Sequence, residues 1–186
     1  MQANDVAKSL NQYLTFFLAG EEYAITILQV TDIIECGVVT RVPGTPPWIR
    51  GVHNLRGTVV PVIDLAIKFG LPATEITRRT CVVIVEIRVD DEALIMGVMA
   101  DSVHQVIELG ADQIQAAPAF GPRVRVDCVL GMASSNGKFI VLLDIDRILA
   151  TDEVLNAATS VLEDPAPLPD EEWLRELPSH LRVAAE

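Results

Sequence analysis

The chain contains 186 residues, of which 50% are apolar and 22% are charged, with 26 acidic against 14 basic residues and a net charge of −12. This composition is typical of a globular protein with a substantial core, and it excludes a wholly disordered chain. The negative charge argues against a general binder of nucleic-acid backbones or anionic lipids, so a protein partner is favoured.

The first third of the chain is predicted to form a hairpin, a short helix and a strand. Residues 1–12 show no periodicity and are interpreted as a flexible leader. Residues 13–26 contain two β-favouring runs around a turn at Gly20, which predicts a hairpin. Apolar residues at helical spacing predict a short helix over Ile27–Glu35, and Val38–Val42 has the composition of a strand.

The stretch from Gly51 to Leu65 joins a turn to a run of β-branched residues. Near-continuous apolar residues over Thr58–Ile63 predict a strand buried on both faces, because a half-solvated strand alternates apolar with polar residues. Arg56 is the one charged residue between His53 and Asp64, and it falls at the turn. A guanidinium held there suits recognition of a partner, while a solubilising turn arginine is the plain alternative.

The rest of the chain is rich in strands. About nine short strands with two brief helices predict an all-β fold of barrels or a sandwich. No internal repeat with clear residue identity is evident, although the halves before and after about Phe69 could each close a small barrel. The elements predicted after the central stretch are a helical turn at Leu65–Phe69, strands at Cys81–Ile87, Ala93–Met99, Asp101–Ile107, Val124–Leu130 and Lys138–Leu143, and a helix that begins at Asp144.

The C-terminal part changes composition sharply at Pro165, Pro167 and Pro169. Residues 153–186 are interpreted as an acidic, proline-linked tail with an amphipathic turn or two around Trp173. Removal of the chain beyond about Asp152 is expected to leave the fold intact.

The sequence contains no pattern typical of a catalytic, metal or nucleotide site. The three histidines are scattered without a second ligand at metal-binding spacing, and there is no phosphate-binding glycine loop and no nucleophile elbow. We therefore expect no cofactor, no metal and no enzymatic activity; an enzyme whose site assembles only in space is the alternative. The three dispersed cysteines, and the absence of a signal sequence and of an apolar run of about 18 residues, favour a soluble, cytoplasmic protein with reduced thiols.

Several motifs resemble the CheW family of chemotaxis coupling proteins. Asn54–Gly57 followed by VVPVIDL is similar to the family segment NLRG-x-x-x-P-h-h-D-L, where h is apolar. The resemblance covers roughly residues 13–152, with its motifs in the family's order. The further matching stretches are Gly20–Ile33, Val42–Pro46, Ile49–Val52, the segment QIQAAPAF at 113–120, and Leu130–Gly131.

The resemblance implies a non-enzymatic scaffold of two intertwined, five-stranded SH3-like barrels with short helices. Members of the family bridge the cytoplasmic tip of a methyl-accepting chemoreceptor and the regulatory domain of the chemotaxis histidine kinase, in membrane-associated receptor arrays. Phe120 matches a contact to the kinase or within rings of these proteins, although Gln115 and Ala119 depart from the charges common nearby. The positions that match the receptor-facing groove are Val30, Asp32, Ile33, Arg56 and Cys81.

The chemistry of these residues agrees with a helical partner. A groove of Val30, Ile33 and Cys81, bordered by Asp32 and Arg56, suits an amphipathic helix laid with its apolar stripe inward. The alternative for the three apolar residues is a place in the core. The alternative function is an accessory or decoy scaffold subunit of a non-motility chemosensory system.

Overall fold

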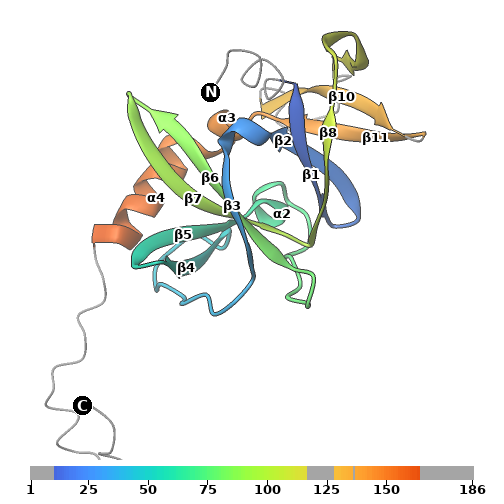
Figure 1. Cartoon of the computed structure of the whole chain (residues 1–186). Helices are drawn as coiled ribbons and strands as arrows, with labels where there is room; N and C mark the ends of the chain where they lie inside the picture. The colour runs from blue at the N-terminus through green and yellow to red at the C-terminus, as the bar shows by residue number, and fades with distance from the viewer. Residues whose placement is uncertain (1–10, 117–127, 136, 164–186) are drawn as a thin grey trace, which may run out of the picture.

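The computed structural model describes residues 11–116, 128–135 and 137–163, which form eleven strands and a few short helices (Figure 1). One sheet has the strand order β8-β1-β2-β11-β10-β9, and the other has the order β3-β6-β7-β5-β4. We call them barrel A and barrel B. The strands of barrel A are β1 (Gln12–Leu18), β2 (Glu21–Thr26), β8 (Ser102–Glu108), β9 (Ile114–Gln115), β10 (Val129–Ser135) and β11 (Lys138–Leu143). The strands of barrel B are β3 (Val30–Glu35), β4 (Ile49–Leu55), β5 (Thr58–Asp64), β6 (Cys81–Val89) and β7 (Glu92–Ala100).

The predicted all-β fold of two small SH3-like barrels is confirmed. Barrel A contains one strand more than the five expected, because the two-residue strand β9 pairs with β10. The predicted hairpin around Gly20 is present as β1 and β2, and the strand after the turn at Arg56 is present as β5. Strand β5 is buried from Val60 onward, whereas Thr58 and Val59, predicted to be buried, are exposed. The predicted Val124–Leu130 strand lies largely outside the described residues, since β10 is described only from Val129 onward.

Two predictions near the first barrel junction are wrong. Ile27–Glu35 is not a helix: a 3₁₀ turn at Ile27–Gln29 leads into strand β3. A bulge between Val30 and Asp32 interrupts the strict alternation of β3, and this interruption produces the apparent helical spacing. Val38–Val42 is not a strand either, because only Thr40 pairs, as an isolated bridge to Val52 of β4.

The two barrels are built on the same plan, which the sequence alone did not reveal. Read from β8 to β10 and from β3 to β4, their strands follow one order with the same parallel and antiparallel pairings. The β4–β5 and β10–β11 hairpins have a register shift at the same place, before Gly51 and before Gly131. One constant offset relates Gly51 to Gly131, Gly57 to Gly137 and Asp64 to Asp144, and a second relates Val30–Glu35 (VTDIIE) to Val103–Glu108 (VHQVIE).

The repeats exchange hairpins, so the halves before and after Phe69 do not each close a barrel. The first hairpin, β1–β2, pairs with β8 and β11 from the second half of the chain. The hairpin β6–β7 pairs with β3 and β5 from the first half. Each barrel therefore consists of a hairpin from one repeat and the remaining strands of the other, which is the intertwined arrangement that the family resemblance implied.

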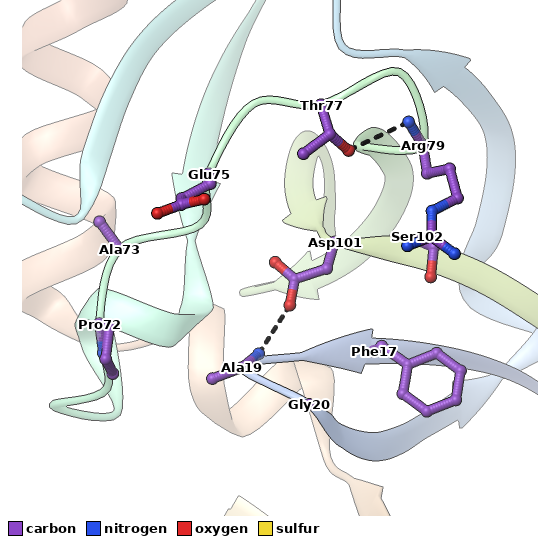
Figure 2. A pocket seen from close by; sticks show the side chains of 10 residues that line it. All are labelled: Phe17, Ala19, Gly20, Pro72, Ala73, Glu75, Thr77, Arg79, Asp101 and Ser102. Atoms are coloured by element: carbon purple, nitrogen blue, oxygen red, sulfur yellow. Dashed lines mark hydrogen bonds between the residues drawn. The ribbon is translucent and has the colours of Figure 1, made fainter.

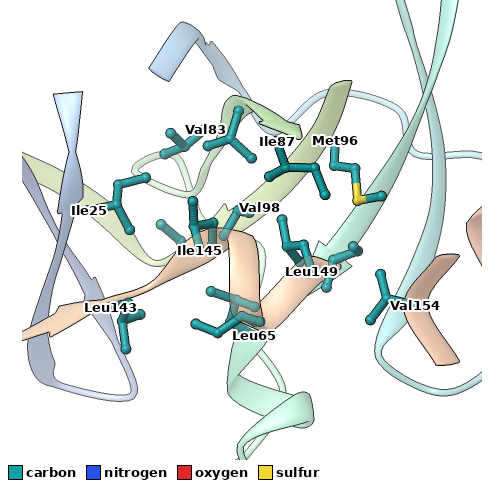
Figure 3. Close-up of a cluster of buried hydrophobic side chains, with 14 of the residues drawn as sticks. Ile25, Leu65, Val83, Ile87, Met96, Val98, Leu143, Ile145, Leu149 and Val154 are labelled. Carbon is teal, nitrogen blue, oxygen red and sulfur yellow. The ribbon is translucent and has the colours of Figure 1, made fainter. Parts of the chain in front are cut away.

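Most of the buried apolar side chains form one cluster between the barrels, which we call the interbarrel core (Figure 3). It joins Ile25 and Leu143 of barrel A to Val83 and Val98 of barrel B, with Ile145 of helix α3 (Ile145–Leu149) inserted between them. Each barrel also has a small core of its own. The barrel A core is Ala24, Leu109, Ala133, Ile140 and Leu142, and the barrel B core is Val60, Val62, Val82, Ile84 and Met99.

The packed part of the chain continues past residue 152. Helix α4 (Asp152–Glu163) lies against barrel B (Figure 1). Val154, Ala157, Ala158 and Val161 recur at helical spacing, and all four are buried in the interbarrel core. The first residues assigned to the acidic tail therefore belong to the folded protein, while the prolines and Trp173 lie outside the described residues.

Candidate functional site

Strand β3 is a free edge of barrel B in the described part of the chain, because it pairs with β6 on one side only. An edge strand offers its unpaired backbone groups to a partner, although in β3 the Ile33 N–H already donates to the Asp32 carboxylate at 2.9 Å. Ile33 lies in the middle of this strand with 42% of its surface exposed, although a large aliphatic side chain prefers burial. Four of the five residues predicted to face a receptor lie on β3 or bond to it: Val30, Asp32, Ile33 and Arg56.

Asp32 and Arg56 form an ion pair that spans the seam of barrel B. Arg56 lies in the two-residue turn between β4 and β5, and its Nη2 donates to Oδ2 of Asp32 across 3.0 Å. Since β3 and β4 are the two ends of the sheet, this pair ties one edge to the other. The arginine side chain is 84% exposed and the aspartate 29%, so the pair remains accessible to a partner.

The turn holds Arg56 in an uncommon backbone conformation. Both turn residues have positive φ, 52° at Arg56 and 91° at Gly57, as in the tight turns that match the twist of a hairpin. The side chain of Asn54 accepts a hydrogen bond from the Gly57 N–H at 2.7 Å. The guanidinium therefore projects from a rigid turn, as the sequence predicted.

The apolar residues of the predicted groove lie on the opposite face of the sheet from the ion pair. Directly opposed residues of an antiparallel sheet point to the same face. Ile33 is opposite Val83, which belongs to the interbarrel core, whereas Asp32 is opposite Ile84, which belongs to the barrel B core. The structure thus brings Asp32 and Arg56 together and places them on one side of β3. The residues on the other side are Val30, Ile33 and Cys81.

Cys81 is a core residue at the end of this surface. Only 8% of its area is exposed, and its thiol lies 4.0 Å from the Ala100 carbonyl. Burial raises the pKa of the Cys81 thiol, and it raises that of Cys36 as well. Both thiols are therefore held in the protonated, unreactive form near neutral pH. Phe120, the predicted kinase or ring contact, lies outside the described residues.

Asp64 fixes the far end of the β4–β5 hairpin, a role that the sequence did not predict. Its buried carboxylate accepts the N–H groups of Ala66 and Ile67 at the start of helix α2 (Leu65–Lys68), and both the N–H and the hydroxyl of Thr74. Arg50 pairs with it at 3.3 Å. An aspartate directly before a helical turn is the signal that identifies this role.

The equivalent aspartate in barrel A has a simpler role. Asp144 accepts the Arg147 N–H as the N-cap of α3, as predicted. Asp146, in the first turn of the same helix, accepts hydrogen bonds from the Gln29 amide and the Arg88 N–H. That carboxylate therefore joins α3 to the junction before β3 and to β6.

A hollow of about 660 Å³, lined by both apolar and polar residues, lies between the β1–β2 turn and the loop that leads into β6 (Figure 2). Among its lining residues, the Ala19 N–H donates to the Asp101 carboxylate at 2.7 Å, and the Arg79 N–H donates to the Thr77 hydroxyl at 3.2 Å. Within the described residues, no three His, Cys, Asp or Glu side chains are grouped so as to hold a metal ion. None of the described helices is long and apolar enough to cross a membrane.

The comparisons with known proteins agree with one another. The CheW-like domain model matches residues 12–153. The chemotaxis protein CheW of Klebsiella aerogenes is 34% identical over 143 residues, covering 77% of this chain and 84% of its own, and that of Bacillus subtilis is 41% identical over 111 residues, covering 60% and 69%. The crystal structure of the scaffolding protein TtCheW from Thermoanaerobacter tengcongensis superposes with a TM-score of 0.68 at 29% identity, covering 77% of this chain and 90% of that one. The chain therefore belongs to the CheW-like family of chemotaxis scaffold proteins.

Proposed function

We propose that the protein is a cytoplasmic, non-enzymatic adaptor that couples the helical tip of a chemoreceptor to the regulatory domain of the chemotaxis histidine kinase. The observation that carries the proposal is the free edge of β3 in a chain of the CheW-like family. Ile33 is exposed on one face of this edge strand, and the Asp32–Arg56 ion pair lies on the other face. A helix laid along β3 buries Ile33 and places its own charged residues near the pair.

The test is binding to a soluble receptor signalling fragment, measured by calorimetry. Ile33→Asp places a charge where the receptor helix has to pack, so we expect at least a tenfold loss of affinity, equivalent to about 1.4 kcal/mol. Ile95→Asp is the matched control, because Ile95 is also a strand residue of barrel B with 42% of its surface exposed. Equal losses in the two variants would remove β3 as the receptor site.

The second half of the proposal concerns the kinase. When the receptor fragment, the kinase and this protein are mixed, we expect kinase autophosphorylation to rise above its level without the adaptor, and Phe120→Ser to reduce that rise while leaving receptor binding intact. Receptor binding with no effect on the kinase would instead identify an accessory or decoy scaffold. If the protein alone catalysed the turnover of a substrate, that result would contradict the non-enzymatic assignment.

A further inference from the structure

The shared plan of the two barrels identifies a position in barrel A that corresponds to the Asp32–Arg56 seam. Val30 and Ile33 of β3 correspond to Val103 and Val106 of β8, and the turn that contains Gly57 corresponds to the turn that contains Gly137. Like Ile33, Val106 is an exposed aliphatic residue on an edge strand, with 49% of its surface exposed. The surface between β8 and the β10–β11 hairpin is thus the counterpart of the surface where the ion pair closes barrel B.

In barrel A this surface is a pocket of about 610 Å³. A pocket of that size accepts one or two side chains of a partner. Its walls come from strands that are far apart in the sequence and contribute residues with two kinds of chemistry. The apolar wall is formed by Phe17 and Phe139, and the polar wall by Glu21, Glu22, His104 and Lys138.

The apolar wall is unusually exposed for its composition. Phe139 has 59% of its surface in contact with solvent, although it lies on a central strand of the sheet. The ring of Phe17 is 5.6 Å from that of His104 and forms the adjoining surface. An aromatic or long aliphatic side chain from a partner would cover both rings and bury the apolar surface that Phe139 exposes to solvent.

The polar wall favours a positive charge beside that apolar group. The Glu22 side chain is only 13% exposed, and His104 Nδ1 lies 2.8 Å from its Oε1, where the ring N–H donates to the carboxylate. Glu21 adds a second carboxylate, whereas Lys138 is the one lysine or arginine among the lining residues. A partly buried carboxylate attracts a cation more strongly than an exposed one, because less water screens it.

We propose that this pocket is a second polypeptide-docking site, which takes a partner segment carrying an aromatic or long aliphatic side chain next to an arginine or lysine. The site lies on barrel A and is separate from the β3 surface. Its test needs neither receptor nor kinase, so its outcome is independent of the proposed function. The scaffold then holds two protein segments through corresponding positions of its two repeats.

The experiment is an amide NMR titration of the whole protein with short capped peptides. Acetyl-Phe-Arg-amide is the probe, acetyl-Phe-Glu-amide reverses the charge, and acetyl-Gly-Arg-amide removes the ring. We expect the probe to shift the amides of Gly20, Glu22, Gln105 and Lys138 with a dissociation constant of about 1 mM, the scale for two side chains. Both control peptides should bind at least about tenfold more weakly.

Two variants and a matched control assign the effect to the pocket. Phe139→Ser should weaken binding of acetyl-Phe-Arg-amide at least about fivefold. Glu22→Gln should remove the protein's preference for this peptide over acetyl-Phe-Glu-amide. Val59→Ser is the control, since Val59 is the equivalent of Phe139 in barrel B and is 48% exposed. The Val59→Ser variant should bind acetyl-Phe-Arg-amide as tightly as the wild-type protein does. The same spectra report whether each variant is folded. If Glu22→Gln does not fold, the Phe139→Ser variant tests the pocket alone, because Phe139 is exposed and its replacement should not disturb the fold.

Three results would overturn the proposal. The first is no shift at the pocket amides up to about 10 mM probe, ten times the expected constant. The second is equal binding of the arginine and glutamate peptides. The third is tighter binding by benzylammonium than by the dipeptide, which would indicate a site for small organic cations in place of a polypeptide.

Discussion

Asp32 and Arg56 join the two ends of the barrel B sheet through one hydrogen-bonded ion pair of 3.0 Å. The pair is solvent-exposed, so its contribution to folding is small, about 0.2–1 kcal/mol. It lies beside the edge strand at which we place the receptor. These facts separate the role of Arg56 in binding from its role in stability.

Arg56→Ala should lower the free energy of unfolding by less than about 1 kcal/mol and weaken receptor binding by about 2 kcal/mol. Arg56→Gly loses the same ion pair but relieves the positive φ, so it should be more stable than Arg56→Ala by about 1 kcal/mol. Chemical denaturation and calorimetry measure the two quantities. If Arg56→Gly restores receptor binding, the turn conformation and not the guanidinium controls binding.

Asp64 and Asp144 occupy equivalent positions in the two repeats but differ in burial, which makes them a matched pair. Asp64→Ala removes the acceptor of several buried N–H groups and the partner of Arg50, so we expect a loss of about 3–5 kcal/mol. Asp144→Ala removes a more exposed N-cap and should cost about 1 kcal/mol. Urea denaturation measures the loss of unfolding free energy in each variant. Similar losses in the two variants would contradict the hydrogen-bond network described for Asp64.

Gly51 is required by a close approach of two backbone segments. A Cβ at this position would overlap the Thr40 carbonyl, which accepts the Val52 N–H at 2.8 Å. Gly51→Ala should therefore cost about 3 kcal/mol or more by breaking the Thr40–Val52 bridge. Gly44→Ala is the control: its φ is also positive, at 78°, but no atom lies within 4 Å, so about 1 kcal/mol is expected. Thermal unfolding of both variants provides the comparison.

Helix α4 should be necessary for stability although it lies at the limit of the CheW-like match. A chain that ends at Thr151 loses the burial of Val154 and Val161, which contribute about 1.5–3 kcal/mol each. A chain that ends at Glu163 should melt within a few degrees of the full protein. Asn156→Ala is the control, because Asn156 lies on the exposed face of the helix and its replacement should leave the melting temperature unchanged. Equal melting temperatures for the two truncated chains would show that α4 adds nothing.

The sequence predicted the elements whose signal is local. The turn at Arg56, the helical turn after Asp64 and the strands β6 and β11 each depend on neighbouring residues, and all are present. Strand β3 was misread because its bulge shifts the alternation of apolar residues, so periodicity alone resembled a helix. Whether such a segment forms a strand or a helix depends on its pairing partner, and the partner of β3 is β6, which is far away in the chain.

The sequence predicted which residues form the receptor site, and this stays a prediction, but it did not predict how they are arranged. Motif similarity identified Asp32 and Arg56, and the structure joins them. The division of β3 into a charged face and an apolar face depends on the register between β3 and β6, which no local pattern encodes. The internal repeat escaped notice because few identities survive, chiefly Gly51 with Gly131, Gly57 with Gly137 and Asp64 with Asp144.

The exchange of hairpins also sets the order in which the protein can be completed on the ribosome. Barrel B needs residues 30–100 only, so its strands can pair while the rest of the chain is still being synthesised. The β1–β2 hairpin emerges first but has to wait for β8 and β11 before its edges are covered. The first hairpin of the fold to be synthesised is thus among the last to have its edges covered, so β1 and β2 depend longest on protection from aggregation in the nascent chain.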